Sequence, residues 1–245
     1  AHGAYYASHV FNPFFLAGTE TLAFELWEQL GNRAPESVVL PVGNGSLLLG
    51  LYHGFGRLLA AGLVERLPRL VAVQAAACAP IYHAFHAGQL AVEPAPRDPT
   101  VASGLAIAQP ARGSQILAAL RDTQGTALCV SEEAILQARD DLARCGFYVE
   151  ETSAVTVAGL EELVELTAET PGETTVVVPT GHGLKTAGPA CDGATARPRR
   201  SRPSPGNFPG SPRYGEERAS LPGSRCGSRG GAGWSCWTFM NWKKR

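Results

Sequence analysis

A glycine-rich turn offers the clearest chemistry in this 245-residue sequence. The segment Gly43-Asn44-Gly45-Ser46-Leu47 follows the apolar, β-branched run Ser37-Val38-Val39-Leu40 and opens a stretch, Leu47 to Arg69, with apolar residues at helical spacing. This order predicts a buried strand, a tight turn and a helix. Free backbone N–H groups and the positive end of a helix dipole meet at such a turn, which makes it a natural site for an anion.

Four residues of the turn suit a phosphate. Gly43 and Gly45 can take positive φ and let a ligand approach the backbone closely, and Asn44 and Ser46 add side-chain donors. The alternative is an ordinary tight connection between a strand and a helix. Two well-known phosphate loops are excluded, because the sequence has neither GxxxxGK[ST] nor a GxGxxG followed by an acidic residue about 20 positions later.

Five segments, in the same order along the chain, resemble fold-type II pyridoxal-phosphate enzymes, and most of all threonine synthase and its relatives. Together they lie within roughly residues 4 to 187. They are Tyr6-Ala7-Ser8-His9-Val10-Phe11-Asn12-Pro13-Phe14-Phe15, Gly43-Asn44-Gly45-Ser46-Leu47, Pro99-Thr100-Val101-Ala102-Ser103-Gly104-Leu105, Glu151-Thr152-Ser153-Ala154 and Thr180-Gly181-His182-Gly183-Leu184-Lys185.

The resemblance implies pyridoxal phosphate as the cofactor and assigns six residues to it. Gly43, Asn44, Gly45, Ser46 and Leu47 would hold the phosphate. Thr180 would meet the pyridine nitrogen and leave it unprotonated; the alternative is that Thr180 only caps a strand end. Such enzymes also need a Schiff-base lysine.

That lysine is missing from the expected place. The Ser-x-Lys-Asp motif of the family does not occur, and the lysines of this chain are Lys185, Lys243 and Lys244. Lys185 belongs to the last of the matching segments and not to the family's Schiff-base motif, so no catalytic residue is assigned. Ser103 also departs from the family, because relatives carry an acidic residue there.

Two functions follow from the resemblance and the missing lysine. The first is a threonine synthase-like lyase that converts O-phosphohomoserine and water to threonine and phosphate, or, within the same family, a serine or threonine dehydratase. The second is a non-catalytic remnant that at most binds a phosphate-bearing ligand. The expected partner is a small amino-acid substrate, and a homodimer stays open.

The elements around these residues alternate between strand and helix. This pattern predicts an α/β fold, a parallel twisted sheet with flanking helices, incomplete at its N-terminus. Because ligands bind at the carboxyl ends of such strands, residues 43–46, 151–153 and 180 can face one cleft. The five expected strands are 37–40, 70–74, 126–130, 147–150 and 174–179.

Several local features give further expectations. A helix is expected from Leu22 to Leu30, capped by Thr19 or Thr21 and closed by Gly31. The helix after the glycine turn should run to Pro68, and Ser131 should cap a helix that Gly146 ends. The aromatic side chains near the N-terminus are expected in the core, namely Phe11, Phe14, Phe15 and Trp27.

Composition separates two regions. Residues 1–187 form the partial enzyme domain, and residues 188–245, rich in Arg, Pro, Gly and Ser, are expected to be a disordered basic tail or an aberrant extension. The alternative for the tail is an arm for an acidic partner, although nucleic acid is not favoured by a net charge of −1.

The remaining expectations concern location and metal. No run of 18 apolar residues and no signal peptide is visible, which favours a cytoplasmic protein with no membrane partner. The six cysteines lack metal-ligand spacing, so no metal site is expected. A domain without its front part should expose apolar surface and aggregate.

Overall fold

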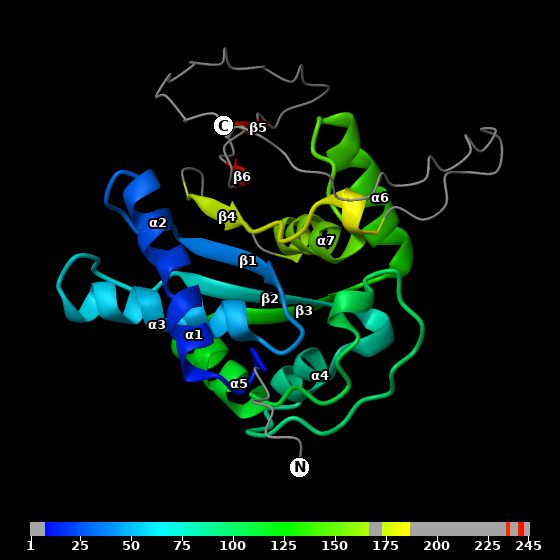
Figure 1. The fold of residues 1–245 in the computed structure, drawn as a ribbon, viewed down its shortest axis with the longest axis horizontal. Coiled ribbons are helices and arrows are strands. Elements are labelled where there is room, and N and C mark those ends of the chain that lie inside the picture. Colours follow the sequence, from blue (N-terminus) through cyan, green and yellow to red (C-terminus); the bar gives the residue numbers. More distant parts are fainter. Residues whose placement is uncertain (1–7, 167–172, 187–233, 236–239, 243–245) are drawn as a thin grey trace, which may run out of the picture.

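The computed structural model describes residues 8–166, 173–186, 234–235 and 240–242. Its centre is a parallel sheet of four strands in the order β3-β2-β1-β4 (Figure 1). The predicted α/β fold with a parallel sheet is therefore confirmed. The strands are β1 (Ser37–Pro41), β2 (Arg69–Ala75), β3 (Thr126–Val130) and β4 (Thr175–Val177).

The predicted strand at residues 147–150 is wrong. Only Val149 pairs there, in an isolated antiparallel bridge to His182. Residues 147–150 connect two helices, α6 (Glu132–Arg144) and α7 (Glu151–Leu166), that pack against each other on the same face of the sheet. A connection this short stays between the helices and does not enter the sheet.

Little of the expected tail lies within the described residues. The backbone of β6 (Met240–Trp242) runs antiparallel to β4, and β5 (Trp234–Ser235) pairs with β6. The rest of residues 188–245 lies outside the described part of the chain, as do residues 1–7 at the start of the resemblance.

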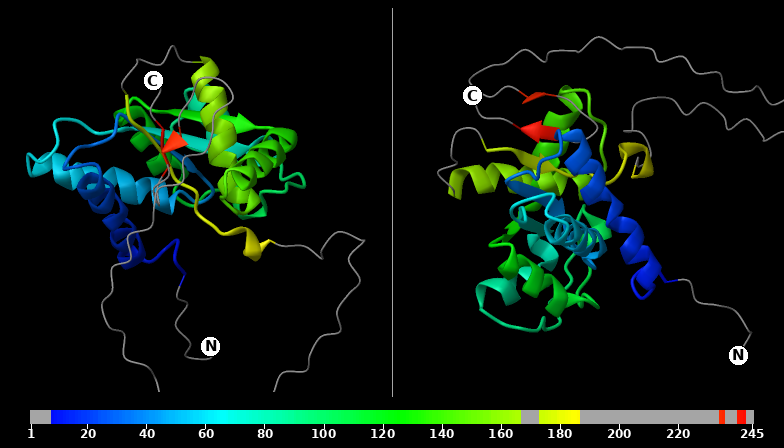
Figure 2. Two further views of the ribbon diagram at one scale, coloured as in Figure 1. Left: turned by 90° about the horizontal axis from the view of Figure 1, so that it is seen from above. Right: turned by 90° about the vertical axis from the view of Figure 1, so that its left-hand side faces the viewer.

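Helices cover both faces of the sheet (Figures 1 and 2). Alternate residues of β1 separate the two cores: Val38 and Leu40 pack with α3 (Ser46–Ala60) and α5 (Gly113–Asp122), whereas Val39 packs with α6 and α7. This alternation is the normal period of a strand. The remaining helical segments are α1 (Pro13–Thr19), α2 (Thr21–Gln29), α4 (Pro80–His86), and the 3₁₀ turns Ala76–Cys78, Ser103–Leu105 and Gly183–Lys185.

Glycines with positive φ end several of the helices. Gly31 closes α2 and Gly146 follows α6, as predicted. The expectation that α3 runs to Pro68 is wrong, because Gly62 takes φ of 70° and the amide of Leu63 bonds to Leu58 O. This is a Schellman motif, which ends the helix at Ala60.

One of the predicted side-chain caps forms and the other does not. The hydroxyl of Ser131 accepts the Ala134 amide at 3.2 Å, which confirms that cap. Neither Thr19 nor Thr21 caps α2, because a second helix, α1, ends directly before it and Glu20 occupies the N-cap position. The Thr19 hydroxyl instead donates to Leu16 O inside α1.

Two glycines let α3 approach α1 and α2 closely. A Cβ on Gly50 would overlap Thr19, and a Cβ on Gly54 would lie 2.6 Å from Ala23 Cβ. An ion pair between Arg57 and Glu20 joins the same helices. This packing holds α3, and with it the glycine turn at its first residue, in a fixed position on the sheet.

The aromatic residues near the N-terminus are mostly on the surface. Phe11 is 70% exposed, Phe14 83% and Phe15 43%, so their predicted core position is wrong. The short helix α1 has no buried residue and touches the core through Leu16. Only Trp27, on α2, packs against the core as expected.

We expect Phe11→Ser and Phe14→Ser together to reduce aggregation without lowering the free energy of unfolding. Exposed aromatic groups that cluster on a surface favour association, and removing them costs no core packing. Light scattering and binding of an apolar dye would measure the change. The matched control is Phe55→Ala, which empties a fully buried site and should cost about 3–5 kcal/mol. Unchanged scattering in the double variant would contradict the expectation.

Candidate functional site

The glycine turn lies between β1 and α3, as the sequence predicts. Gly45 is the N-cap residue of α3 and takes φ of 76° in the left-handed region. Gly43 does not need positive φ. It needs space instead, because a Cβ there would lie 3.2 Å from Ile107 Cγ1 and 3.3 Å from Gly104 O. The two glycines therefore serve different purposes, one for backbone conformation and one for close packing.

The turn presents a row of unused backbone donors. Within the described part of the chain, the N–H groups of Gly43 to Leu48 have no hydrogen-bond acceptor, and the first bonded amide of α3 is that of Leu49, to Gly45 O at 2.9 Å. Gly45 and Leu48 are buried residues. These donors lie at the positive end of a helix of 15 residues, an arrangement that suits an anion.

Thr180 is held by its backbone. The hydroxyl of the fully buried Ser153, in the first turn of α7, accepts the amides of Thr180 at 2.9 Å and Gly181 at 2.6 Å. The same hydroxyl lies 3.2 Å from Thr180 Oγ1. Thr180 itself is an exposed residue. Ser153 therefore fixes the backbone, while the Thr180 hydroxyl lies beside it at the surface.

The sheet brings the two segments together. β1 and β4 are neighbours with Val39 opposite Val177, and the Val178 amide donates to Val39 O at 3.0 Å. Gly43 and Thr180 follow these paired residues by four and three positions, so both lie just past the carboxyl ends of adjacent strands. The predicted common edge is where the structure places them.

The turn Ser103–Leu105 connects the glycine turn with α7. Gly104 O lies next to Gly43, and a Cβ on Gly104 would lie 3.0 Å from Thr152 Oγ1. Ser103 itself is exposed on this 3₁₀ turn. Residues 43–46, 103–105, 151–153 and 180 thus form one continuous set of contacts.

Comparison with known proteins gives this set a context. Residues 1–181 match the family model described as "Pyridoxal-phosphate dependent enzyme". The chain belongs to this family. It is 39% identical to threonine synthase of Methanosarcina acetivorans over 181 residues, and 35% identical to threonine synthase of Methanocaldococcus jannaschii. Each alignment covers 74% of this chain and 45% of the relative, so the chain spans about half the length of these curated relatives.

Solved structures agree on the fold. A threonine deaminase from T.th. matches with a TM-score of 0.52 at 28% identity, over 63% of this chain and 54% of that one. A fungal L-serine ammonia-lyase from Rhizomucor miehei matches with a TM-score of 0.58 at 22% identity, over 70% of this chain and 53% of that one. The predicted relation to fold-type II pyridoxal-phosphate enzymes is confirmed, and pyridoxal phosphate is the cofactor of the family.

The described residues fit part of this cofactor. The unused N–H groups suit its phosphate, and the exposed Thr180 lies at the same edge of the sheet. The described residues do not offer an unpaired lysine for the cofactor's aldehyde. Lys185 is the only lysine among the residues that the structure describes, and its Nζ lies 3.1 and 3.0 Å from the carboxylate oxygens of Glu150. Lys243 and Lys244 lie outside them.

Sequence reasoning gave no role to Ser153 or Glu150, although both lie in or beside a matching segment. Their partners, Thr180, Gly181 and Lys185, are 27 to 35 positions away along the chain. No local pattern reports such a contact. The roles of Glu150 and Ser153, at the start of α7, can be assigned only once the fold brings the loop after β4 into contact with them.

A carboxylate beside the site, Glu151, is held in its charged form. Burial raises the pKa of Glu151, but hydrogen bonds from Thr186, from its own backbone amide and from Arg139 outweigh this, so the pKa lies below its usual range. The Arg139 guanidinium lies 2.9 Å away. These contacts join the end of the loop after β4 to α6 and α7.

We expect the fold to lose stability in acid as the Glu151 carboxylate becomes protonated. Because its pKa is lowered by folding, its contribution is present above the usual carboxyl pKa of about 4.3 and is lost as pH falls through the lower folded value. Glu151→Gln should lower the free energy of unfolding near neutral pH by a few tenths to about 1 kcal/mol and flatten its fall below about pH 5. Denaturant titrations at several pH values measure this, with the exposed Glu25→Gln as control; parallel pH curves for both variants would argue against it.

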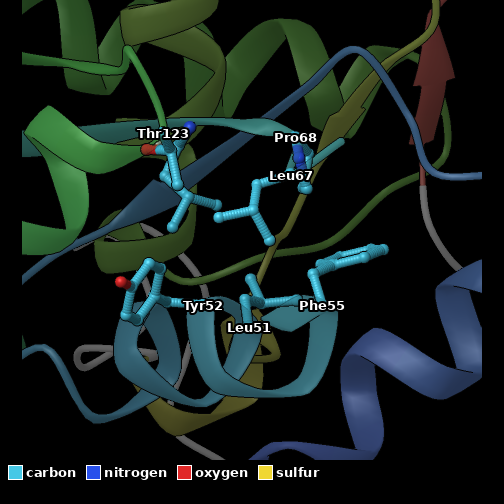
Figure 3. A pocket seen from close by; sticks show the side chains of 7 residues that line it. Leu51, Tyr52, Phe55, Leu67, Pro68 and Thr123 are labelled. Carbon is cyan, nitrogen blue, oxygen red and sulfur yellow. Dashed lines mark hydrogen bonds between the residues drawn. The ribbon is translucent and has the colours of Figure 1, made fainter. Parts of the chain in front are cut away.

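The hollow shown in Figure 3 is not a candidate site. It lies between α3, the start of β2 and the end of α5, and its lining is mainly apolar. At its rim the Tyr52 hydroxyl donates to Asp122 at 2.8 Å, and this hydrogen bond, with burial, raises the pKa of Tyr52. No group of three metal-ligating side chains occurs in the described ranges, and none of their helices is long and apolar enough to cross a membrane.

Proposed function

We propose that this chain carries the cofactor-binding half of a threonine synthase-like lyase that acts on an amino acid. Gly43, Asn44, Gly45, Ser46 and Leu47 hold the phosphate of pyridoxal phosphate, and Thr180 meets its pyridine nitrogen. The observation that carries the proposal is the row of unused N–H groups at the start of α3, at the same sheet edge as Thr180. The relatives named threonine synthase support the reaction class.

Each group of residues has a physical task. When bound, pyridoxal phosphate supplies an electron sink that stabilises negative charge on the substrate. The backbone amides of the glycine turn bind the phosphate dianion, aided by the helix dipole. The Thr180 hydroxyl would donate a hydrogen bond to the ring nitrogen and so favour its unprotonated form. Ser153 holds the Thr180 backbone in place for that contact.

The substrate proposed is O-phosphohomoserine, converted with water to threonine and phosphate. Within the family, a serine or threonine dehydratase is the variant supported by the likeness to threonine deaminase. We expect small amino acids as partners, a cytoplasmic location and, by analogy with relatives, a homodimer.

A non-catalytic binder is the second candidate. The observation that favours it is the ion pair of Lys185, which leaves no unengaged lysine in the described part of the chain. In that case the glycine turn binds a phosphate-bearing ligand and no covalent attachment follows.

Titration with pyridoxal phosphate tests both candidates. We expect an absorbance change that saturates and that inorganic phosphate competes away, because both anions use the same amides. Borohydride reduction and peptide mapping then separate the candidates: a labelled lysine together with phosphate release from O-phosphohomoserine supports the lyase, and binding without label supports the non-catalytic binder. Cofactor binding that phosphate does not compete with would contradict the assignment of the glycine turn.

A further inference from the structure

We propose that Lys185 is a positioning residue whose ammonium group neutralises the buried Glu150 carboxylate and thereby fixes the Thr180–Gly181 backbone at the carboxyl edge of the sheet. This inference rests on the proposed function and deepens it. It also means that Lys185 does not serve as a substitute for the missing covalent lysine.

The Glu150 carboxylate lies in an unusual position for a charged group. Its side chain is 4% exposed, and both of its oxygens lie within 3.1 Å of Lys185 Nζ. Within the described residues, Lys185 is its one ion-pair partner. A buried charge without a partner is strongly unfavourable, so the ammonium group is required at this place.

The loop after β4 folds around this carboxylate. A Cβ on Gly181 would overlap the Glu150 carboxylate, which therefore packs directly on the Gly181 backbone. The Glu150 amide donates to Gly181 O at 3.1 Å, while Lys185, four residues later, reaches back to the carboxylate. Gly181 and Lys185 are thus both held by Glu150.

Further contacts hold the residues between Gly181 and Lys185. His182 forms the bridge to Val149, and the Gly183 amide donates to Tyr148 O at 3.0 Å. A Cβ on Gly183 would lie 2.7 Å from the Tyr148 ring. Residues 181–185 are therefore held against residues 148–150, and we call this arrangement the clamp. Among the described residues, the Lys185 ion pair is the only charged contact that the clamp makes with Glu150.

The clamp determines where Thr180 lies. Thr180 and Gly181 share the Ser153 hydroxyl, so a shift of Gly181 away from an unpaired Glu150 carboxylate must also move Thr180. The glycine turn has no described hydrogen bond to this loop. Loss of Lys185 should therefore affect the contact to the ring and spare the contact to the phosphate.

The main test compares two ligands in three variants of the full chain. Lys185→Met should weaken the affinity for pyridoxal phosphate roughly tenfold and leave the affinity for inorganic phosphate unchanged. Lys185→Arg, which keeps the charge, should restore most of the loss. Lys185→Met combined with Glu150→Gln should also recover part of it, because the unpaired charge is removed. An equal loss for both ligands, or no loss for either, would overturn the inference, as would a borohydride label on Lys185.

A second measurement needs no ligand and so separates this inference from the proposed function. Hydrogen exchange of the Thr180 and Gly181 amides should become at least about tenfold faster in Lys185→Met, while exchange in α3 stays the same. If the chain binds neither ligand but shows this local change, the proposed function fails and the clamp remains. Uniformly faster exchange across the fold would reduce Lys185 to a general stabilising residue and overturn the inference.

Discussion

Replacing Gly45 by alanine is expected to lower the free energy of unfolding by about 2–5 kcal/mol and to abolish phosphate binding. Two costs add. A non-glycine residue in the left-handed region costs about 1–2 kcal/mol, and the new Cβ would overlap the side chain of Ile116, which is fully buried in the core on α5. Because Ile116 is enclosed, it cannot move aside without repacking its neighbours, which adds about 1–3 kcal/mol.

The loss of binding follows from the same geometry. Gly45 is the N-cap of α3, and its conformation sets the course of the backbone that carries the free amides of residues 43–48. If alanine drives the backbone out of that conformation, these donors change their positions. Calorimetric titration with inorganic phosphate and denaturant unfolding measure the two effects separately.

Gly56 provides the control within the same helix. A Cβ on Gly56 would meet nothing within 4 Å, so Gly56→Ala should keep phosphate affinity and stabilise α3 by up to about 1 kcal/mol. If Gly45→Ala binds phosphate as tightly as Gly56→Ala, the turn is an ordinary connection and the anion site is refuted.

Features that depend on a few neighbouring residues were predictable from the sequence. The strand–glycine–helix order placed the turn between β1 and α3, and a single serine before acidic residues marked the cap at Ser131. The same kind of signal is present at Gly62, six residues before the proline at which the helix was expected to stop. Gly62 takes positive φ and ends the helix before the proline, whereas Gly50, Gly54 and Gly56 stay helical inside α3.

Features that depend on the assembled fold were not predictable. The apolar run at residues 147–150 has strand composition, yet the packing of α6 against α7 leaves it outside the sheet. Phe11 and Phe14 are apolar, yet α1 and the turn before it lie on the surface and expose them. The part of the site around Thr180 was not predictable for the same reason, because its contact with Ser153 joins residues 27 positions apart in the sequence.

Replacing Ser153 by alanine is the second large effect that we expect. The change removes the acceptor of two amides, Thr180 and Gly181, at a fully buried position. Leaving such donors without partners should lower the free energy of unfolding by about 2–3 kcal/mol. Denaturant unfolding measures this, and Ser114→Ala on the exposed side of α5 is the control, with a change within about 0.5 kcal/mol. Equal stability of the two variants would contradict the expectation.

Thr180→Val separates the backbone of Thr180 from its hydroxyl. The variant keeps both amides on Ser153 and removes only an exposed hydroxyl, so stability should change by less than about 1 kcal/mol. Affinity for pyridoxal phosphate should nevertheless fall, while affinity for inorganic phosphate stays, because only the ring contact is lost. Ser153→Ala should weaken pyridoxal phosphate binding as well, and adding Thr180→Val to it should cost little more. If the two losses were instead fully additive, Ser153 would act on the ligand independently of Thr180, and its hydroxyl would not be what places the Thr180 side chain.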